Sequence, residues 1–120
     1  MEQKKFRSVV LYKDYFTRFL VAQRQKVKDK IVWTLRLIEE LPQIPETFLK
    51  HITGTDGLYE IRVQSGGEIF RVFCFFDESK LVILINGFQK KTQKTPKLEI
   101  ARATKLKKEY YEEKKQLKRS

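Results

Sequence analysis

The sequence predicts an α+β fold, with a small antiparallel β-sheet, an N-terminal helical hairpin and a C-terminal helix. Residues 58–88 hold three runs of β-branched and aromatic residues separated by turn sequences, as is typical of hairpin-linked strands. On either side of these runs, apolar residues recur at spacings of three and four, which predicts helices. These residues are Val27, Ile31, Leu35 and Ile38 in the first segment, and Ile100, Ala103, Leu106 and Tyr110 in the second.

Two elements are expected before the main strands. Residues 1–12 end in a run of β-branched, aliphatic and aromatic residues, which predicts a strand that joins the sheet. Residues 13–41 then form the helical hairpin. Asp14 is a candidate cap for its first helix, and its second helix is expected to end near Leu41, because Pro42 cannot continue a helix.

The sheet is expected to be a three-stranded antiparallel meander over residues 58–88. The turn sequences Gly66–Gly67 and 77–80 divide it into three strands, and a linker over residues 43–56 leads into the first. The last run, residues 81–85, is apolar at every position, which predicts a central strand covered on both faces.

Strand alternation predicts a cationic surface on this sheet. Glu60 and Arg62 share a face of the first strand, and Arg71 shares a face with Phe73 and Phe75 in the second. The helices are expected to cover one face of the sheet and to leave the other available. Arginines beside aromatic residues on such a face are suited to gripping phosphates.

The chain is strongly basic, with a net charge of +11. The predicted basic helix over residues 96–115, with its flanks, accounts for most of this, since twelve Lys and Arg but four acids follow Phe88. A polyanion such as nucleic acid or the ribosome is the natural partner. An acidic protein, a membrane surface, or a solvated helix without a partner would also fit the charge.

The size and composition predict one domain, residues 1–120, of a cytoplasmic protein. Cys74 is the only cysteine, which excludes an internal disulfide, and it lies in an apolar run typical of a core. No signal peptide is recognised, and no apolar run approaches the length of about 20 residues that a membrane span requires.

Three motifs occur in order along the chain: GLYEIR at residues 57–62, FRVF at 70–73 and LINGFQKKT at 84–92. With them the chain resembles the RelE/ParE toxin superfamily, and within it the phage-derived HigB-like toxins. The resemblance implies a RelE-like fold and a ribosome-dependent endoribonuclease, an mRNA interferase that cuts mRNA in the ribosomal A site. Such enzymes use no metal and no cofactor, because the 2′-hydroxyl of the message attacks the adjacent phosphate.

The resemblance also implies the site residues. Arg71 would stabilise the charge of the transition state, Arg62 would hold phosphate, and Lys90 and Lys91 form a basic pair that holds phosphate or transfers a proton. The proton-transfer candidates are Glu60, which could instead pair with Arg62 or a lysine, and His51. Further RNA-binding candidates are Phe88, which stacks on a base or packs, with Lys94, Lys97, Arg102 and Lys105.

Two departures from the family are visible in the sequence. Glu60 stands where several relatives carry a lysine, and no tyrosine lies between Phe88 and the final helix. Purely structural roles are also open: Arg62 could pair with Glu60 or Glu68 across the hairpin, and Arg71 could be an edge cation that blunts an exposed strand.

The resemblance implies partners as well. These are the ribosome, mRNA and a cognate helix-turn-helix antitoxin. The protein would bind operator DNA only as part of its complex with the antitoxin. No membrane partner is expected. Two alternative functions remain open from the sequence. One is a ParE-like gyrase-poisoning toxin, and the other is a non-catalytic RNA- or ribosome-binding module with the same cationic face.

Overall fold

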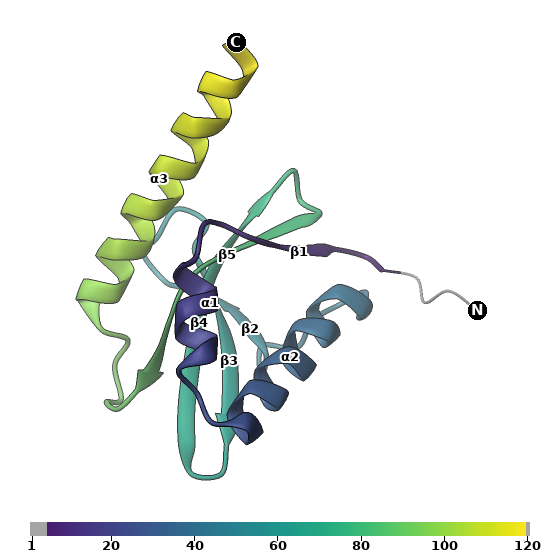
Figure 1. Ribbon diagram of the computed structural model, residues 1–120, viewed down its shortest axis with the longest axis vertical. Coiled ribbons are helices and arrows are strands. Elements are labelled where there is room, and N and C mark those ends of the chain that lie inside the picture. The colour runs from purple at the N-terminus through teal and green to yellow at the C-terminus, as the bar shows by residue number, and fades with distance from the viewer. Residues whose placement is uncertain (1–4, 120) are drawn as a thin grey trace.

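The fold is α+β, as predicted. The computed structural model describes residues 5–119, so residues 1–4 of the expected N-terminal strand segment lie outside it. The elements, in order, are β1 (Ser8–Leu11), α1 (Tyr15–Val21), α2 (Gln25–Glu40), β2 (Leu49–His51), β3 (Tyr59–Ser65), β4 (Glu68–Asp77), β5 (Leu81–Lys90) and α3 (Lys97–Arg119) (Figure 1). Within the described residues, no helix combines the length and apolar character needed to cross a membrane.

The sheet has five strands in the order β1-β5-β4-β3-β2. The predicted meander is present as β3, β4 and β5, and β5 is covered on both faces as expected. Two expectations need correction. β1 pairs parallel with β5, so the sheet is mostly rather than wholly antiparallel. The predicted linker over residues 43–56 contains β2, a strand of three residues that is too short to give a clear alternation.

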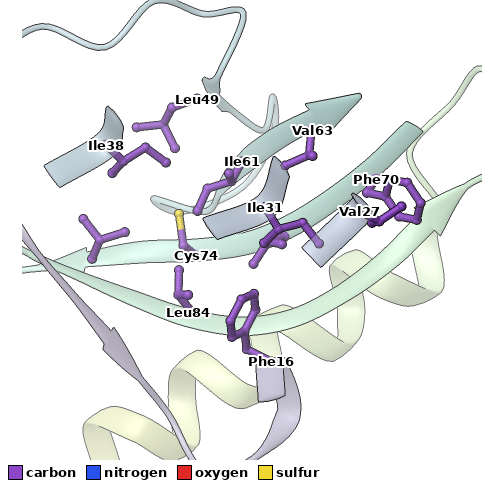
Figure 2. Packing of buried hydrophobic residues seen from close by; sticks show 12 residues of the cluster. Phe16, Val27, Ile31, Ile38, Leu49, Ile61, Val63, Phe70, Cys74 and Leu84 are labelled. Atoms are coloured by element: carbon purple, nitrogen blue, oxygen red, sulfur yellow. The ribbon is translucent and has the colours of Figure 1, made fainter. Parts of the chain in front are cut away.

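The sheet is covered on both faces, in contrast to the prediction that one face stays available. On one face, α1 and α2 bury Phe16, Val27 and Ile31 against strand residues that include Phe70 and the fully buried Cys74, as Figure 2 shows. On the other face, α3 packs only over the part formed by Phe73, Phe75 and their neighbours. The remaining part of that face carries no helix, and the cationic residues lie there.

The helix ends follow the predictions with two differences. α2 begins after Arg24 and ends at Glu40, just before Leu41 and Pro42. Asp14 precedes α1, but its side chain makes no capping hydrogen bond and forms an ion pair with Arg18 instead, 2.8 Å from Oδ2 to Nε. α3 ends at Arg119, beyond the expected residue 115.

A β-bulge in β5 sets which residues of this strand face α3. From Val72 to Cys74, β4 advances two residues, whereas the paired segment of β5 from Leu84 to Gly87 advances three. The extra residue reverses the alternation. As a result Asn86 points to α3, where its Nδ2 donates to Glu99 Oε1 at 2.9 Å, and the residues after it change face.

The C-terminal half of α3 is anchored by Asp77 at the end of β4. The buried carboxylate accepts hydrogen bonds from Tyr110 at 2.6 Å and Lys114 at 2.7 Å. Burial alone would raise the pKa of Asp77, but these hydrogen bonds and the charge of Lys114 outweigh it, so the pKa is lowered. The anchor is therefore an ionised carboxylate, and it orients the basic helix against the sheet.

Gly87 allows α1 to approach β5 closely, and this contact gives a first prediction. A Cβ at this position would lie 2.5 Å from Cδ2 of Phe19. Gly87→Ala should therefore lower the free energy of unfolding by about 1–3 kcal/mol, the usual cost of overpacking. Gly67→Ala is the matched control, since a Cβ there meets nothing within 4 Å. Urea unfolding followed by circular dichroism measures both, and equal stability of the two variants would contradict the close packing.

Candidate functional site

The part of the sheet that α3 leaves bare carries a cluster of charged side chains from four strands. Register pairs place Lys50 of β2 opposite Glu60 of β3, Arg62 of β3 opposite Arg71 of β4, and Arg71 opposite Phe88 of β5. Side chains of directly paired residues lie on the same face. We call this group the cationic face, and its residues are Lys50, Glu60, Arg62, Arg71, Phe88 and Lys90.

Arg71 and Glu60 form the buried centre of the cationic face. Arg71 is 6% exposed and Glu60 7%. Arg71 Nε lies 3.4 Å from Glu60 Oε2, and Arg62 Nε lies 3.8 Å from Glu60 Oε1. Neither Arg71 Nε nor Glu60 Oε2 makes a hydrogen bond, so the pair is an ion pair with unused hydrogen-bonding capacity. Arg71 Nη1 donates to the carbonyl of Phe70 at 3.1 Å, which fixes the guanidinium.

The charge at this centre is positive, because one carboxylate faces two guanidinium groups. Burial lowers the pKa of Arg71, Glu60 opposes that shift, and the charge of Arg62 adds to it. An arginine stays protonated throughout the physiological range, so the lowered pKa indicates a cation that is held at a cost. An anion arriving at this centre would relieve that cost.

Lys90 completes the cationic face on β5. Burial lowers the pKa of Lys90, the charges of Arg71, Arg62 and Lys50 lower it further, and Glu60 opposes them. The β-bulge brings Lys90 here, since it puts Phe88 and Lys90 on the α3 side of the sheet. A lysine of lowered pKa releases its proton more readily than a lysine in water, which suits proton transfer.

A groove runs from the cationic face around the edge of β3. Its volume is about 700 Å³, and Arg62 and Arg71 line it on the side of the cationic face. Lys30, Thr34 and Phe48 line it on the side of α2. Arg62 and Arg71 therefore belong both to the cationic face and to this groove.

Phe88 packs within the cationic face. Its ring lies edge-on to Phe73, with centroids 5.1 Å apart and planes at 86°. The packing role that the sequence left open is therefore present, and the half-buried ring keeps part of its surface accessible.

Several residues singled out from the sequence lie away from the cationic face. His51 pairs with Tyr59 on the opposite face of the sheet, their rings 5.2 Å apart, so the structure separates it from Glu60 and Arg71. Arg102 lies over the ring of Tyr15, 5.4 Å from its centroid. The other residues of this set are exposed beyond β5 or on α3: Lys91, Lys94, Lys97 and Lys105.

The structural alternatives for the two arginines have different outcomes. Arg71 is not an edge cation, because β4 is the middle strand of the sheet. Arg62 does pair with Glu60, as one alternative expected, but Glu60 also faces Arg71. Among the described residues, no group of three or more His, Cys, Asp or Glu side chains could hold a metal ion.

The sequence reasoning missed Lys50 and the residues of α2 that line the groove. Lys50 belongs to β2, which was read as linker, although buried Leu49 and Ile52 flank it on either side. Lys30 was not among the candidates taken from the sequence. The signal that was available is the spacing of Lys26, Lys30 and Trp33 along one helical stripe.

Comparison with known proteins gives a family. A search among curated proteins found no match. Residues 18–108, which include α2, all of β2 to β5 and the first half of α3, match the family described as "Phage derived protein Gp49-like (DUF891)". Every residue of the cationic face falls inside this match. Because the match covers most of the chain, the protein belongs to the phage-derived Gp49-like family.

Proposed function

We propose that this protein is a RelE/HigB-like toxin of a type II toxin–antitoxin system, and that it cuts mRNA on the ribosome. The observation that carries the proposal is the buried Arg71 at the centre of the cationic face, with its incompletely satisfied ion pair to Glu60. Arginine clusters are well suited to binding phosphate groups, because the planar guanidinium can donate two parallel hydrogen bonds to phosphate oxygens. The Gp49-like family and the three motifs of the RelE/ParE superfamily support this assignment.

The cationic face supplies charge stabilisation for phosphodiester cleavage. In the proposed reaction the 2′-oxygen bonds to phosphorus while the bond from phosphorus to the 5′-oxygen breaks. The products are a 2′,3′-cyclic phosphate and a 5′-hydroxyl. Arg71 and Arg62 would bind the phosphoryl oxygens, on which negative charge grows in the transition state. Because Arg71 is already desolvated and fixed by Phe70, little reorganisation is needed at that moment.

Two residues of the cationic face can transfer the protons. Glu60 is the carboxylate of the cationic face, and Glu60 Oε2 accepts no hydrogen bond. We therefore assign Glu60 as the general base that takes the proton of the 2′-hydroxyl. Lys90 is assigned as the general acid that donates a proton to the leaving 5′-oxygen, since the lowered pKa of Lys90 makes its ammonium a stronger acid. Lys50 and Phe88 would then position the message through its phosphates and a base.

The basic surface beyond β5 fits the partners that this function requires. Lys91, Lys94, Lys97 and Lys105 are exposed and lie on the segment that leads into α3 or on α3 itself. We propose that this surface binds ribosomal RNA or the message. A cognate helix-turn-helix antitoxin with acidic or apolar segments would neutralise the protein by covering the cationic face, and their complex would bind operator DNA.

A non-catalytic RNA- or ribosome-binding module is the second candidate. It is favoured by the absence of histidine and tyrosine from the six residues of the cationic face, which leaves proton transfer to Lys90 and Glu60. Charge cannot separate a nuclease from a binder, but loss of cleavage with retained ribosome binding can.

Substitution of Arg71 tests the proposal. Arg71→Ala should lower the rate of mRNA cleavage by about 10²–10³-fold, the cost of losing a positioned charge donor. Arg71→Ala also leaves the negative charge of the buried Glu60 with less positive charge beside it, which costs stability. Arg71→Lys is therefore the second variant. It keeps the charge but loses the planar fork of donors, and it should cut far more slowly while it still binds ribosomes. Arg18→Ala, on the exposed side of α1, is the control with the same loss of charge.

The measurement is primer extension on a defined mRNA in a purified translation system, with and without ribosomes. Cuts that need ribosomes, disappear in the Arg71 variants and persist in Arg18→Ala would support the nuclease. Translation that stops without any cut would favour the binding module. Translation that proceeds normally would direct the next assay to gyrase poisoning.

The proposed acid role of Lys90 predicts a pH dependence. Since its pKa is lowered, the ammonium is lost at a lower pH than for lysine in water, and cleavage should slow as pH rises through that pKa. Lys90→Arg keeps the charge but does not titrate, so it should remove this alkaline decrease and reduce the rate by about 10²–10⁴-fold. Single-turnover cleavage in preformed ribosome complexes, measured over a range of pH, gives both the rate and its pH dependence. Lys115→Arg on the exposed face of α3 is the control. A wild-type rate that does not fall on the alkaline side, or full activity of Lys90→Arg, would rule out the acid role.

A further inference from the structure

The groove at the edge of β3 has a composition that the proposed cleavage does not explain. Beyond the end of β2, residues 62–65 of β3 have no neighbouring strand on that side, and the groove of about 700 Å³ opens there toward α2. Its charged lining consists of Lys30, Arg62 and Arg71, and no Asp or Glu of the described chain takes part in it. The charged groups that line the groove are therefore all cationic, which favours an anionic occupant.

An aromatic side chain of α2 stands beside this groove, in a second hollow that shares Lys30 with it. Trp33 is 45% exposed, which is unusual for a tryptophan that has a hydrophobic core within reach. Lys30 Nζ lies 4.4 Å from the centroid of the Trp33 ring, and Phe48 meets the ring edge-on at 5.8 Å. This hollow has a volume of about 430 Å³ and is lined by Lys26, Asp29, Lys30, Trp33 and Ser65. The Asp29 carboxylate accepts a hydrogen bond from Gln25 Nε2 at 2.8 Å. Two lysines, one carboxylate and an exposed ring therefore surround a hollow beside the groove, and its net charge is positive.

The occupant of the groove follows from what its walls offer. Arg62 N donates to the carbonyl of Phe48 at 2.8 Å, so by alternation only Gln64 presents its backbone N–H and C=O to the open edge before the turn at Gly66. A peptide that adds as a strand needs several such groups, and this edge is too short to supply them. Single-stranded RNA needs cations for its phosphates and aromatic faces for its bases, which are the groups present.

We propose that the groove and the adjoining hollow form a second RNA subsite, which holds a nucleotide next to the bond that is cut on the cationic face. The proposal rests on the proposed nuclease function, since Arg62 and Arg71 line both places and one strand can pass from the cationic face into the groove. In the subsite, Lys30 leaves the Trp33 ring to bind the phosphate, and the base stacks on the ring face that Lys30 vacates. Stacking tolerates every base, so the subsite contributes affinity and not codon preference.

Fluorescence tests the subsite directly, because Trp33 is the only tryptophan of the chain. Titration of the full-length protein with a short single-stranded oligoribonucleotide at low salt should quench this fluorescence. Lys30→Gln should weaken binding and lower the slope of log affinity against log salt by about one, as expected for one lost phosphate contact. Lys28→Gln is the control on the same helix, about 200° around from Lys30 and outside the groove lining.

Removal of the ring gives a second, independent readout. Trp33→Leu, which keeps an apolar contact for Phe48, should bind an end-labelled oligoribonucleotide about 5- to 150-fold more weakly in fluorescence anisotropy, whereas Trp33→Phe should bind nearly as wild type. Wild-type affinity of Trp33→Leu would overturn the subsite. An acidic peptide of equal charge that quenches Trp33 at lower concentrations than the RNA would also overturn it and make the groove a protein-docking site.

The failure of this inference can be told apart from the failure of the proposed function. In the ribosome assay, Lys30→Gln should raise KM and leave kcat near wild type, whereas the Arg71 variants lower kcat. Quenching of Trp33 by RNA without any cleavage of mRNA would retain the subsite and reject the nuclease. Cleavage without quenching, with all variants at position 33 binding equally, would retain the nuclease and reject the subsite.

Discussion

The extra residue in β5 is the constraint on which the arrangement of the cationic face depends. Before the bulge, Ile83 and Ile85 face α3; without the extra residue, regular alternation would put Gly87 and Gln89 on that side. With it, Gly87 turns to α1, where only a hydrogen fits against Phe19, and Lys90 turns to Arg71. The hydrogen bond from Asn86 to Glu99 ties the bulge to the first turn of α3, so the position of that helix and the facing of Lys90 are set together.

The partial cover by α3 explains why charge can be held on this sheet. Where α3 packs, the face is apolar and aromatic, with Phe73 and Phe75 fully buried. Where it ends, the same strands carry Arg71 and Glu60 at a depth that excludes most water but leaves the groove open. A buried ion pair of this geometry contributes little to stability, since desolvation offsets the attraction. Its incomplete hydrogen bonding is the basis of the proposed phosphate binding, since the planar donors of arginine suit that anion.

Much of this arrangement could be predicted from the sequence, and the limits have physical causes. The facing of Glu60, Arg62 and Arg71 follows from strand alternation and is observed. The facing of Lys90 does not follow from alternation, because a bulge leaves no reliable mark in one sequence. β2 was missed because three residues give too little alternation, and Lys50 was missed with it. The sequence shows the apolar stripe of α3 but not which face of the sheet this stripe packs against. The cover of the second face by α3 was therefore missed.

The most direct test of the account concerns the chemistry assigned to the cationic face. A message whose A-site codon carries 2′-deoxy sugars, presented on ribosomes beside the matching all-ribose message, isolates the role of the 2′-hydroxyl. We expect the all-ribose message to be cut to a 2′,3′-cyclic phosphate and a 5′-hydroxyl, and the deoxy message to stay intact although the protein binds both ribosome complexes equally. Cleavage of the deoxy codon, or products with a free 3′-hydroxyl, would contradict the account, since neither can arise from attack by the message's own 2′-oxygen.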